Sequence, residues 1–190
     1  SGCIEVQIGL ESANKNVLKI LNKGTMNLEE LRKNVLFMVD RGIHVKFFCI
    51  LGAPGETKKT IRETFNYVFQ FPLDKVNAAA NIMVPYPDTR LWLMGRKEGK
   101  TLKDWDDVER YAGIIGNNFN SQSIVLDEVA RFNARILREQ ARLRIRKEWG
   151  KKGFPNIFSV AKFSIVHFAC SVLILFPRLF DFFYRFHKFI

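Results

Sequence analysis

Residues 43–51 read IHVKFFCIL, and the glycine-rich stretch GAPGET follows them at 52–57. A mostly apolar run of this length is typical of a buried strand in a parallel sheet. The two glycines and the proline end the strand in a tight turn, and Thr57 is placed to cap a helix that we predict to run to about Phe71. This stretch therefore predicts a strand, a turn and a helix, which is the repeating unit of α/β folds.

The same order of strand and helix is predicted before and after this unit. The predicted strands cover about 3–10, 43–51 and 76–84, and the predicted helices cover about 14–21, 28–41, 57–71 and 89–98. Helices in this order connect parallel strands through right-handed crossovers. Three units are too few to close a (β/α)₈ barrel, so the predicted fold class is α/β, with parallel strands that form part of a barrel or an open sheet.

The C-terminal ends of the predicted strands carry the most unusual sequences. They are GLES at 9–12, GAPGET at 52–57 and PYPDT at 85–89. Ligands of parallel α/β sheets bind at these strand ends, so the three stretches are candidate site segments. Each also has a structural interpretation, because glycine and proline are common in tight or rigid connections that bind nothing.

Glu11 is the charged residue that stands out at these ends. It follows a strand with an apolar inward face, so its carboxylate needs a partner or a ligand. A ribose diol or an amino group would satisfy it. An ion pair with Lys23 that only joins two parts of the fold is the alternative, and the residues alone leave both open.

Cysteine and histidine spacing gives no metal motif within the chain. Cys3, Cys49 and Cys170 lie far apart, which excludes a disulfide framework and any CxxC or CxxxCxxC box, and the three histidines are scattered.

The net charge of +11 is localised: residues 1–130 hold 17 basic and 16 acidic residues, whereas residues 131–190 hold 13 basic and 3 acidic residues. The basic character therefore belongs to the C-terminal third.

This C-terminal third predicts a basic helix followed by apolar segments. A helix over about 127–150 would place five arginines on one face, namely Arg131, Arg135, Arg138, Arg142 and Arg146. The fifteen uncharged residues 163–177 rise only about 22 Å as a helix, short of the ~30 Å hydrocarbon core. Together with the phenylalanine-rich residues 179–190, they favour a re-entrant or in-plane hairpin on an anionic membrane surface bound through 131–190. A helix that docks on a partner protein is the alternative, and nucleic acid is a less favoured partner of the arginine face.

Read in order, five stretches resemble the C-terminal half of the radical S-adenosylmethionine (SAM) core domain, in the branch that often carries a cobalamin-binding domain. They are IGLES at 8–12, VLKILNKG at 17–24, GI at 42–43, ILGAPGET at 50–57 and PYPDTRL at 85–91. The resemblance implies a partial (β/α)₆ barrel in which a [4Fe-4S] cluster binds SAM and reduces it to a 5′-deoxyadenosyl radical. The family's CxxxCxxC loop is absent, so the cluster ligands would lie outside this chain.

The resemblance also assigns cofactor-binding residues. It places Glu11 and Ser12 at the ribose and amino-acid part of SAM, and Lys23 near the SAM carboxylate. Ile50 and Gly52 match the strand whose end packs against adenine, and Pro85 begins the loop to Thr89 that lies beside cofactor and substrate. Asp88 stands where the family usually has glycine, and aspartate tolerates the turn geometry.

The functional prediction is a fragment of a radical SAM enzyme that acts on an apolar or lipid-like substrate, in the cytoplasm and at the membrane. Cobalamin is a further cofactor that the resemblance allows, and the missing N-terminal half of the same protein is an expected partner. The predicted divisions are 1–100 for the barrel part, 101–153 for a linker and basic helix, and 154–190 for a membrane-associating tail. The alternatives are an RNA-modifying radical SAM enzyme and a non-catalytic membrane or partner-interaction module.

Overall fold

The computed structural model describes residues 2–84, 86–97, 122–150 and 155–176. The strands are β1 (Glu5–Glu11), β2 (His44–Leu51) and β3 (Val76–Ile82). The helices are α1 (Lys15–Ile20), α2 (Leu28–Asp40), α3 (Lys58–Val68), α4 (Arg90–Lys97), α6 (Gln122–Trp149) and α7 (Ile157–Leu175). The predicted boundaries at 100 and 153 fall on residues outside the described ranges, so the proposed division of the chain stays a prediction.

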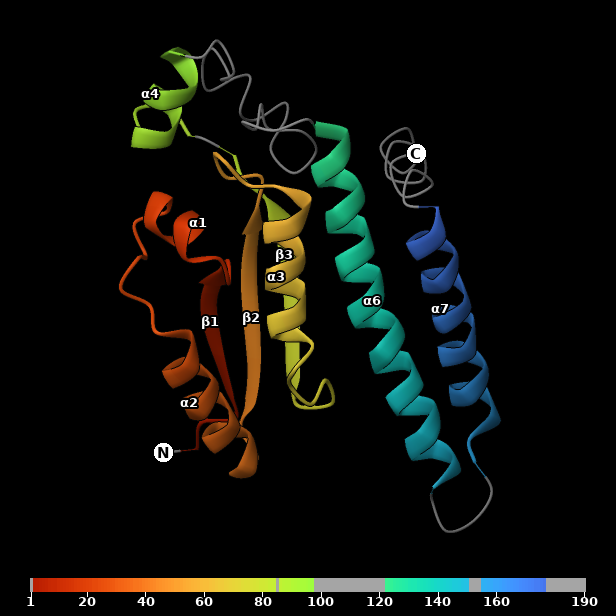
Figure 1. Ribbon diagram of the computed structural model, residues 1–190. Coiled ribbons are helices and arrows are strands. Elements are labelled where there is room, and N and C mark those ends of the chain that lie inside the picture. The colour runs from red at the N-terminus through yellow and green to blue at the C-terminus, as the bar shows by residue number, and fades with distance from the viewer. Residues whose placement is uncertain (1, 85, 98–121, 151–154, 177–190) are drawn as a thin grey trace.

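The three strands form one parallel sheet in the order β1-β2-β3, as Figure 1 shows. The predicted α/β class with parallel strands is therefore confirmed. Each strand continues into a helix, and α2 and α3 lie over the same face of the sheet (Figure 1). This arrangement is consistent with a Rossmann-like fold, and a radical SAM barrel is not shown.

The core lies between the sheet and these two helices. Along β2 every second side chain is fully buried, from Val45 through Phe47 and Cys49 to Leu51, while the intervening residues are half-buried. The burial of side chains along β2 thus alternates, as it does in a strand with one covered face, although the sequence of β2 is apolar almost throughout. Aromatic rings fill the space under the helices, and the ring centroid of Phe47 lies 5.3 Å from that of Phe71.

Side-chain caps set the positions where the helices begin. Asn14 accepts hydrogen bonds from Asn16 and Val17 at the start of α1, and Asn27 does the same for α2. Thr57 and Thr60 cap each other's backbone at the start of α3, which is the reciprocal capping box. The helices predicted from these cap residues are found where the sequence places them.

The free edge of β3 is closed by the long helix α6. The side-chain amide of Asn133 accepts a hydrogen bond from the Ala80 backbone N–H and donates one to the Ala80 carbonyl, each at 3.1 Å. One side chain therefore satisfies both backbone groups of an edge residue, as a neighbouring strand would. Phe132 anchors the same turn of α6 in the core, where its ring centroid lies 4.4 Å from that of Phe65.

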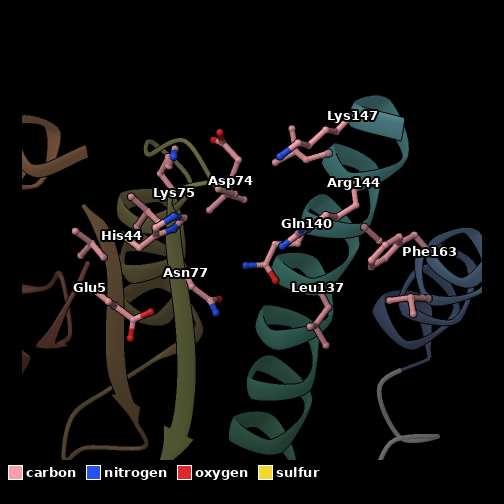
Figure 2. Close-up of a pocket in the computed structure, with 16 residues that line it drawn as sticks. Glu5, His44, Asp74, Lys75, Asn77, Leu137, Gln140, Arg144, Lys147 and Phe163 are labelled. Carbon is pink, nitrogen blue, oxygen red and sulfur yellow. The ribbon is translucent and has the colours of Figure 1, made fainter. Parts of the chain in front are cut away.

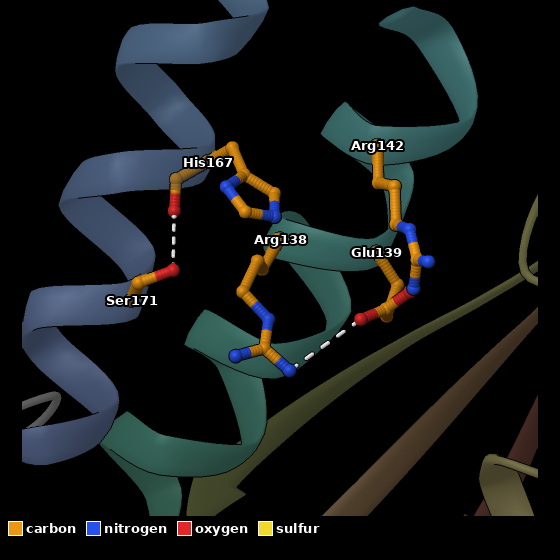
Figure 3. A network of polar contacts seen from close by, with 5 residues as sticks. All are labelled: Arg138, Glu139, Arg142, His167 and Ser171. Carbon is orange, nitrogen blue, oxygen red and sulfur yellow. Dashed lines mark hydrogen bonds and ion pairs between the residues drawn. The ribbon is translucent and has the colours of Figure 1, made fainter. Parts of the chain in front are cut away.

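Helix α7 packs antiparallel along α6, on the side away from the sheet (Figure 1). The arginine row that the sequence predicts on α6 is divided: Arg131 and Arg138 are half-buried, whereas Arg135, Arg142 and Arg146 are exposed. Figure 3 shows the side chain of Arg138 between the two helices, with Nη2 3.4 Å from Oε1 of Glu139. Part of the predicted cationic face therefore supports the α6–α7 pair instead of facing solvent.

Among the described residues, one helix is long and apolar enough to cross a membrane, judged by length and composition alone, and this helix is α7. It has 19 residues. Its most apolar 18-residue stretch has a mean hydropathy of 1.9, and only 6% of that stretch is buried in the protein. Its rise is about 28 Å, which exceeds the length predicted from the uncharged run alone because the helix begins at Ile157. The predicted hairpin with 179–190 lies outside the described residues.

Candidate functional site

The C-terminal end of β1 and the turn that follows α1 bring the predicted site residues Glu11 and Lys23 together. Lys23 Nζ lies 2.8 Å from Glu11 Oε1 and donates to the Gly9 carbonyl at 2.9 Å. The Glu11 side chain is 15% exposed and that of Lys23 is 40% exposed. The ion pair considered as the structural alternative is thus present, and both of its charges remain accessible to a ligand.

Gly9 makes this close approach possible. A Cβ at position 9 would lie 2.5 Å from Glu11 Oε1 and 2.8 Å from Lys23 Nζ, so any larger residue would displace the pair. The strand is also irregular here, because the pairing register shifts between Gly9 and Glu11, and Glu11 itself has a φ of 59°. This bulge turns the Glu11 carboxylate out of the regular strand geometry.

Ser12 is held inside the protein. It is fully buried, its hydroxyl lies 3.2 Å from that of Thr64, and it accepts a hydrogen bond from the Asn14 backbone N–H at 3.1 Å. These contacts join the end of β1 to α3 and orient the start of α1. Direct contact of Ser12 with a cofactor stays a prediction, while its contacts with Thr64 and Asn14 are structural.

The glycine-rich turn after β2 wraps around the carboxylate of Glu56. The backbone N–H groups of Gly52 and Ala53 donate to Glu56 Oε2 at 2.5 and 3.2 Å. Gly52 has a φ of 97°, which only glycine adopts without strain. The two N–H groups that could have faced an anion are therefore directed to the chain's own carboxylate.

Glu56 is the residue of this site that sequence reasoning missed. Its side chain is almost completely buried, and its Oε1 has no hydrogen-bond partner within the described ranges. Burial raises the pKa of Glu56 to about 7, although the hydrogen bonds from Gly52 and Ala53 act in the opposite direction. The available signal was a single carboxylate placed between the glycines and the helix cap Thr57, where it can fold back on the turn.

Cys49 lies close to both carboxylates and is not a nucleophile in this state. Burial is the main cause that raises the pKa of its thiol to about 12, and the negative charges of Glu11 and Glu56 act in the same direction. The thiol thus stays protonated at neutral pH and packs as a small apolar side chain. Within the described residues no group of three or more histidine, cysteine, aspartate or glutamate side chains could hold a metal ion.

Apolar side chains line the neighbouring part of this edge. Ile50 packs against a small buried cluster made by Val17, Ala53 and Met83, which joins the ends of β2 and β3 to α1. Pro85 lies outside the described residues. After it, Asp88 has a φ of 64°, and Thr89 caps the first turn of α4 by accepting from the Trp92 backbone N–H at 3.2 Å. Aspartate is thus accommodated at the turn position where the resemblance expected glycine.

Comparison with known proteins gives two curated relatives, and no family model matches the chain. The chain is 27% identical over 115 residues to the bacteriochlorophyllide d C-12(1)-methyltransferase of Chlorobaculum tepidum, covering 58% of this chain and 24% of the relative. It is 31% identical over 94 residues to an uncharacterized methyltransferase of Pyrococcus horikoshii, covering 48% of this chain and 19% of the relative. The matched region is therefore about a quarter or less of each relative's length.

These comparisons contradict the assignment to the radical SAM superfamily made from the sequence. Both relatives are named as methyltransferases, so the prediction of a radical SAM enzyme, whether lipid-directed or RNA-modifying, is corrected. The [4Fe-4S] cluster, the 5′-deoxyadenosyl radical and cobalamin have no support in the relatives' names or in the described residues. The sequence stretches that suggested the resemblance are short, and short glycine- and proline-containing strand ends recur in different α/β folds. What the comparisons support is similarity to methyltransferases over part of their length.

Proposed function

We propose that this chain is part of a methyltransferase that takes its methyl group from SAM. The observation that carries the proposal is the similarity to two proteins named as methyltransferases, one of them over more than half of this chain. The strand-end cluster of Glu11, Lys23 and Gly9 gives the proposal a location, because it places accessible charges at the edge where parallel α/β sheets bind ligands.

The chemistry of this cluster fits the polar parts of SAM. Lys23 uses only Oε1 of Glu11, which leaves Oε2 to accept from a ribose hydroxyl or an ammonium group. An ammonium carries three donors, and Lys23 uses two of them on Glu11 and the Gly9 carbonyl, so the third is suited to a carboxylate. Ile50 and the apolar cluster beside it are suited to the adenine ring. When bound, SAM supplies an electrophilic methyl group on a positively charged sulfur.

The sheet face opposite α2 and α3 is the proposed acceptor side. Gly9, Phe48 and Ala79 stand in register across the three strands, so two small residues flank one aromatic ring. Lys46 lies on the same face, with its Nζ 5.1 Å from the centroid of the Phe48 ring. A flat row of this kind is suited to a planar, largely apolar acceptor, and the name of the Chlorobaculum relative, which specifies a bacteriochlorophyllide, supports that class.

Binding of SAM by the purified protein tests the proposal. Equilibrium dialysis with methyl-labelled SAM should show saturable binding, and Glu11→Gln should weaken it roughly 5- to 150-fold, equivalent to 1–3 kcal/mol for a lost charged hydrogen bond. Glu30→Gln is the matched control, because Glu30 is an exposed carboxylate on α2. Absence of SAM binding by the unmodified protein would refute the proposed function. Binding that Glu11→Gln and Glu30→Gln leave equally unchanged would refute the location of the site.

A further inference from the structure

A second concave site lies at the opposite edge of the sheet, where the strands begin. It is a groove of about 650 Å³ between the starts of β2 and β3 on one side and the C-terminal half of α6 with α7 on the other. Figure 2 shows His44 and Lys75 on the sheet side and Arg144 and Lys147 on α6. Because Glu11 and Gly52 lie at the other ends of the strands, this groove is separate from the proposed SAM site.

The groove has a cationic wall. Lys75, Arg144 and Lys147 line it, and none of them forms an ion pair within the part of the chain that the structure describes. Glu5 and Asp74 also line it, so three permanent cations face two carboxylates. Unpaired cations that converge from two elements favour a ligand with a negative charge, since a bound anion would relieve their mutual repulsion.

The side of the groove next to α7 is apolar. Phe163 and Val166 of α7 line it together with Leu137 of α6. An anion alone would leave these side chains in contact with water. A ligand with a charged head and a hydrocarbon chain would satisfy both walls, because the cations contact the head while the apolar side chains cover the chain.

Helix α7 also carries a second apolar face, which is exposed and lies on the side of the helix away from Phe163 and Val166. Its exposed large side chains are Ile157, Phe158, Ile165, Phe168, Leu175 and Phe176, which at 3.6 residues per turn fall within an arc of about 100°. This spacing places them on one face of the helix. Ile165 and Phe168 are each 70% exposed, and a continuous exposed apolar face of this kind marks a surface that is covered in the working protein.

We propose that the groove binds the phosphate headgroup of an anionic phospholipid, and that α7 lies in the plane of the same bilayer with its exposed face in the hydrocarbon. Charge and polarity favour this occupant over a partner protein, because a cationic groove lies directly beside a helix with a mean hydropathy of 1.9. Helix α6 carries exposed arginines, so the α6–α7 pair is suited to lying on the surface rather than inserting together. The proposal goes beyond methyl transfer and does not depend on it.

Vesicle co-sedimentation of the purified protein tests the proposal. Vesicles of phosphatidylcholine alone should bind weakly, and vesicles that also contain phosphatidylglycerol should bind more tightly. The triple variant Lys75→Gln, Arg144→Gln, Lys147→Gln should lose roughly 100-fold of the affinity for anionic vesicles, about fivefold for each cation near an anionic leaflet. High salt should reduce the difference between the two vesicle types, because it screens the charges.

A charge-matched control separates the groove from net charge. The variant Lys33→Gln, Lys58→Gln, Lys59→Gln removes the same charge from exposed positions on α2 and α3, and it should keep most of the affinity. Equal losses in the two triple variants would overturn the groove as the binding site. A second variant, Ile165→Ser with Phe168→Ser, should weaken binding to both vesicle types, because it removes apolar contact without changing charge.

Two further probes distinguish the possible sources of the phosphate. Inorganic phosphate at millimolar concentration should compete only weakly with anionic vesicles, because it lacks the hydrocarbon chain. Tight binding of inorganic phosphate without vesicle binding would overturn the lipid proposal, and so would tight RNA binding with indifference to both vesicle types. Because SAM binding is measured at the opposite edge of the sheet, failure here leaves the result for the proposed function unaffected.

Discussion

The buried carboxyl of Glu56 should make the stability of the fold depend on pH in a predictable direction. Its pKa of about 7 in the folded chain lies above the ordinary value of 4.5, because burial disfavours the charged form. Between pH 4.5 and about pH 7, the folded state therefore keeps a proton on Glu56 that the unfolded state has already released. The contribution of Glu56 to stability is fully present below pH 4.5 and is lost as the pH rises through 7.

The magnitude follows from the size of the pKa difference. At 1.36 kcal/mol per pH unit, the difference of 2.5 units corresponds to about 3 kcal/mol of unfolding free energy lost between pH 4.5 and 7.5. Glu56→Gln removes the titrating group and retains an oxygen that can accept from Gly52 or Ala53. The variant should therefore have a flatter pH profile than the unmodified protein.

Urea unfolding followed by far-ultraviolet circular dichroism at several pH values from 4.5 to 7.5 measures the effect. The difference in unfolding free energy between the unmodified protein and Glu56→Gln isolates this residue, because other titrating groups contribute equally to both. Glu30→Gln removes an exposed carboxylate from α2 and controls for the loss of one negative charge. A difference between the unmodified protein and Glu56→Gln that stays constant over the whole pH range would refute the reasoning.

Two further substitutions test the contacts at the sheet. Gly9→Ala should change the unfolding free energy by less than about 1 kcal/mol, because its Cβ meets the mobile ends of Glu11 and Lys23, but it should weaken SAM binding in equilibrium dialysis by forcing that pair apart. Unchanged SAM affinity would argue against the pair as a ligand site. Asn133→Ala should cost about 2–4 kcal/mol in urea unfolding, because both backbone groups of Ala80 lose their partner. Asn133→Asp should cost more at neutral pH, since a carboxylate oxygen would then face the Ala80 carbonyl, and an aspartate variant more stable than the alanine variant would contradict the proposed edge contact.

The sequence was sufficient to predict the local structure of this chain. Apolar runs of strand length predicted the strands, and the cap residues Asn14, Asn27 and Thr57 predicted where helices begin. These predictions lie close to the observed elements, because capping and periodicity act over a few residues. The parallel α/β order also followed from the succession of these elements. The family assignment failed, because it rested on short strand-end stretches whose specificity the chain itself could not test.

Contacts between distant residues were decided by the tertiary structure. The sequence left open whether Glu11 binds a ligand or pairs with Lys23, and the structure shows the ion pair, formed by a close approach over Gly9, while the ligand role stays a proposal. The protonatable state of Glu56 depends on burial under a turn, which no local pattern expresses. The groove joins the start of β3 to residues of α6 and α7 more than sixty positions away. Sequence patterns report the periodicity and capping of each segment, whereas burial, electrostatic environment and converging charges arise only when separate segments pack together.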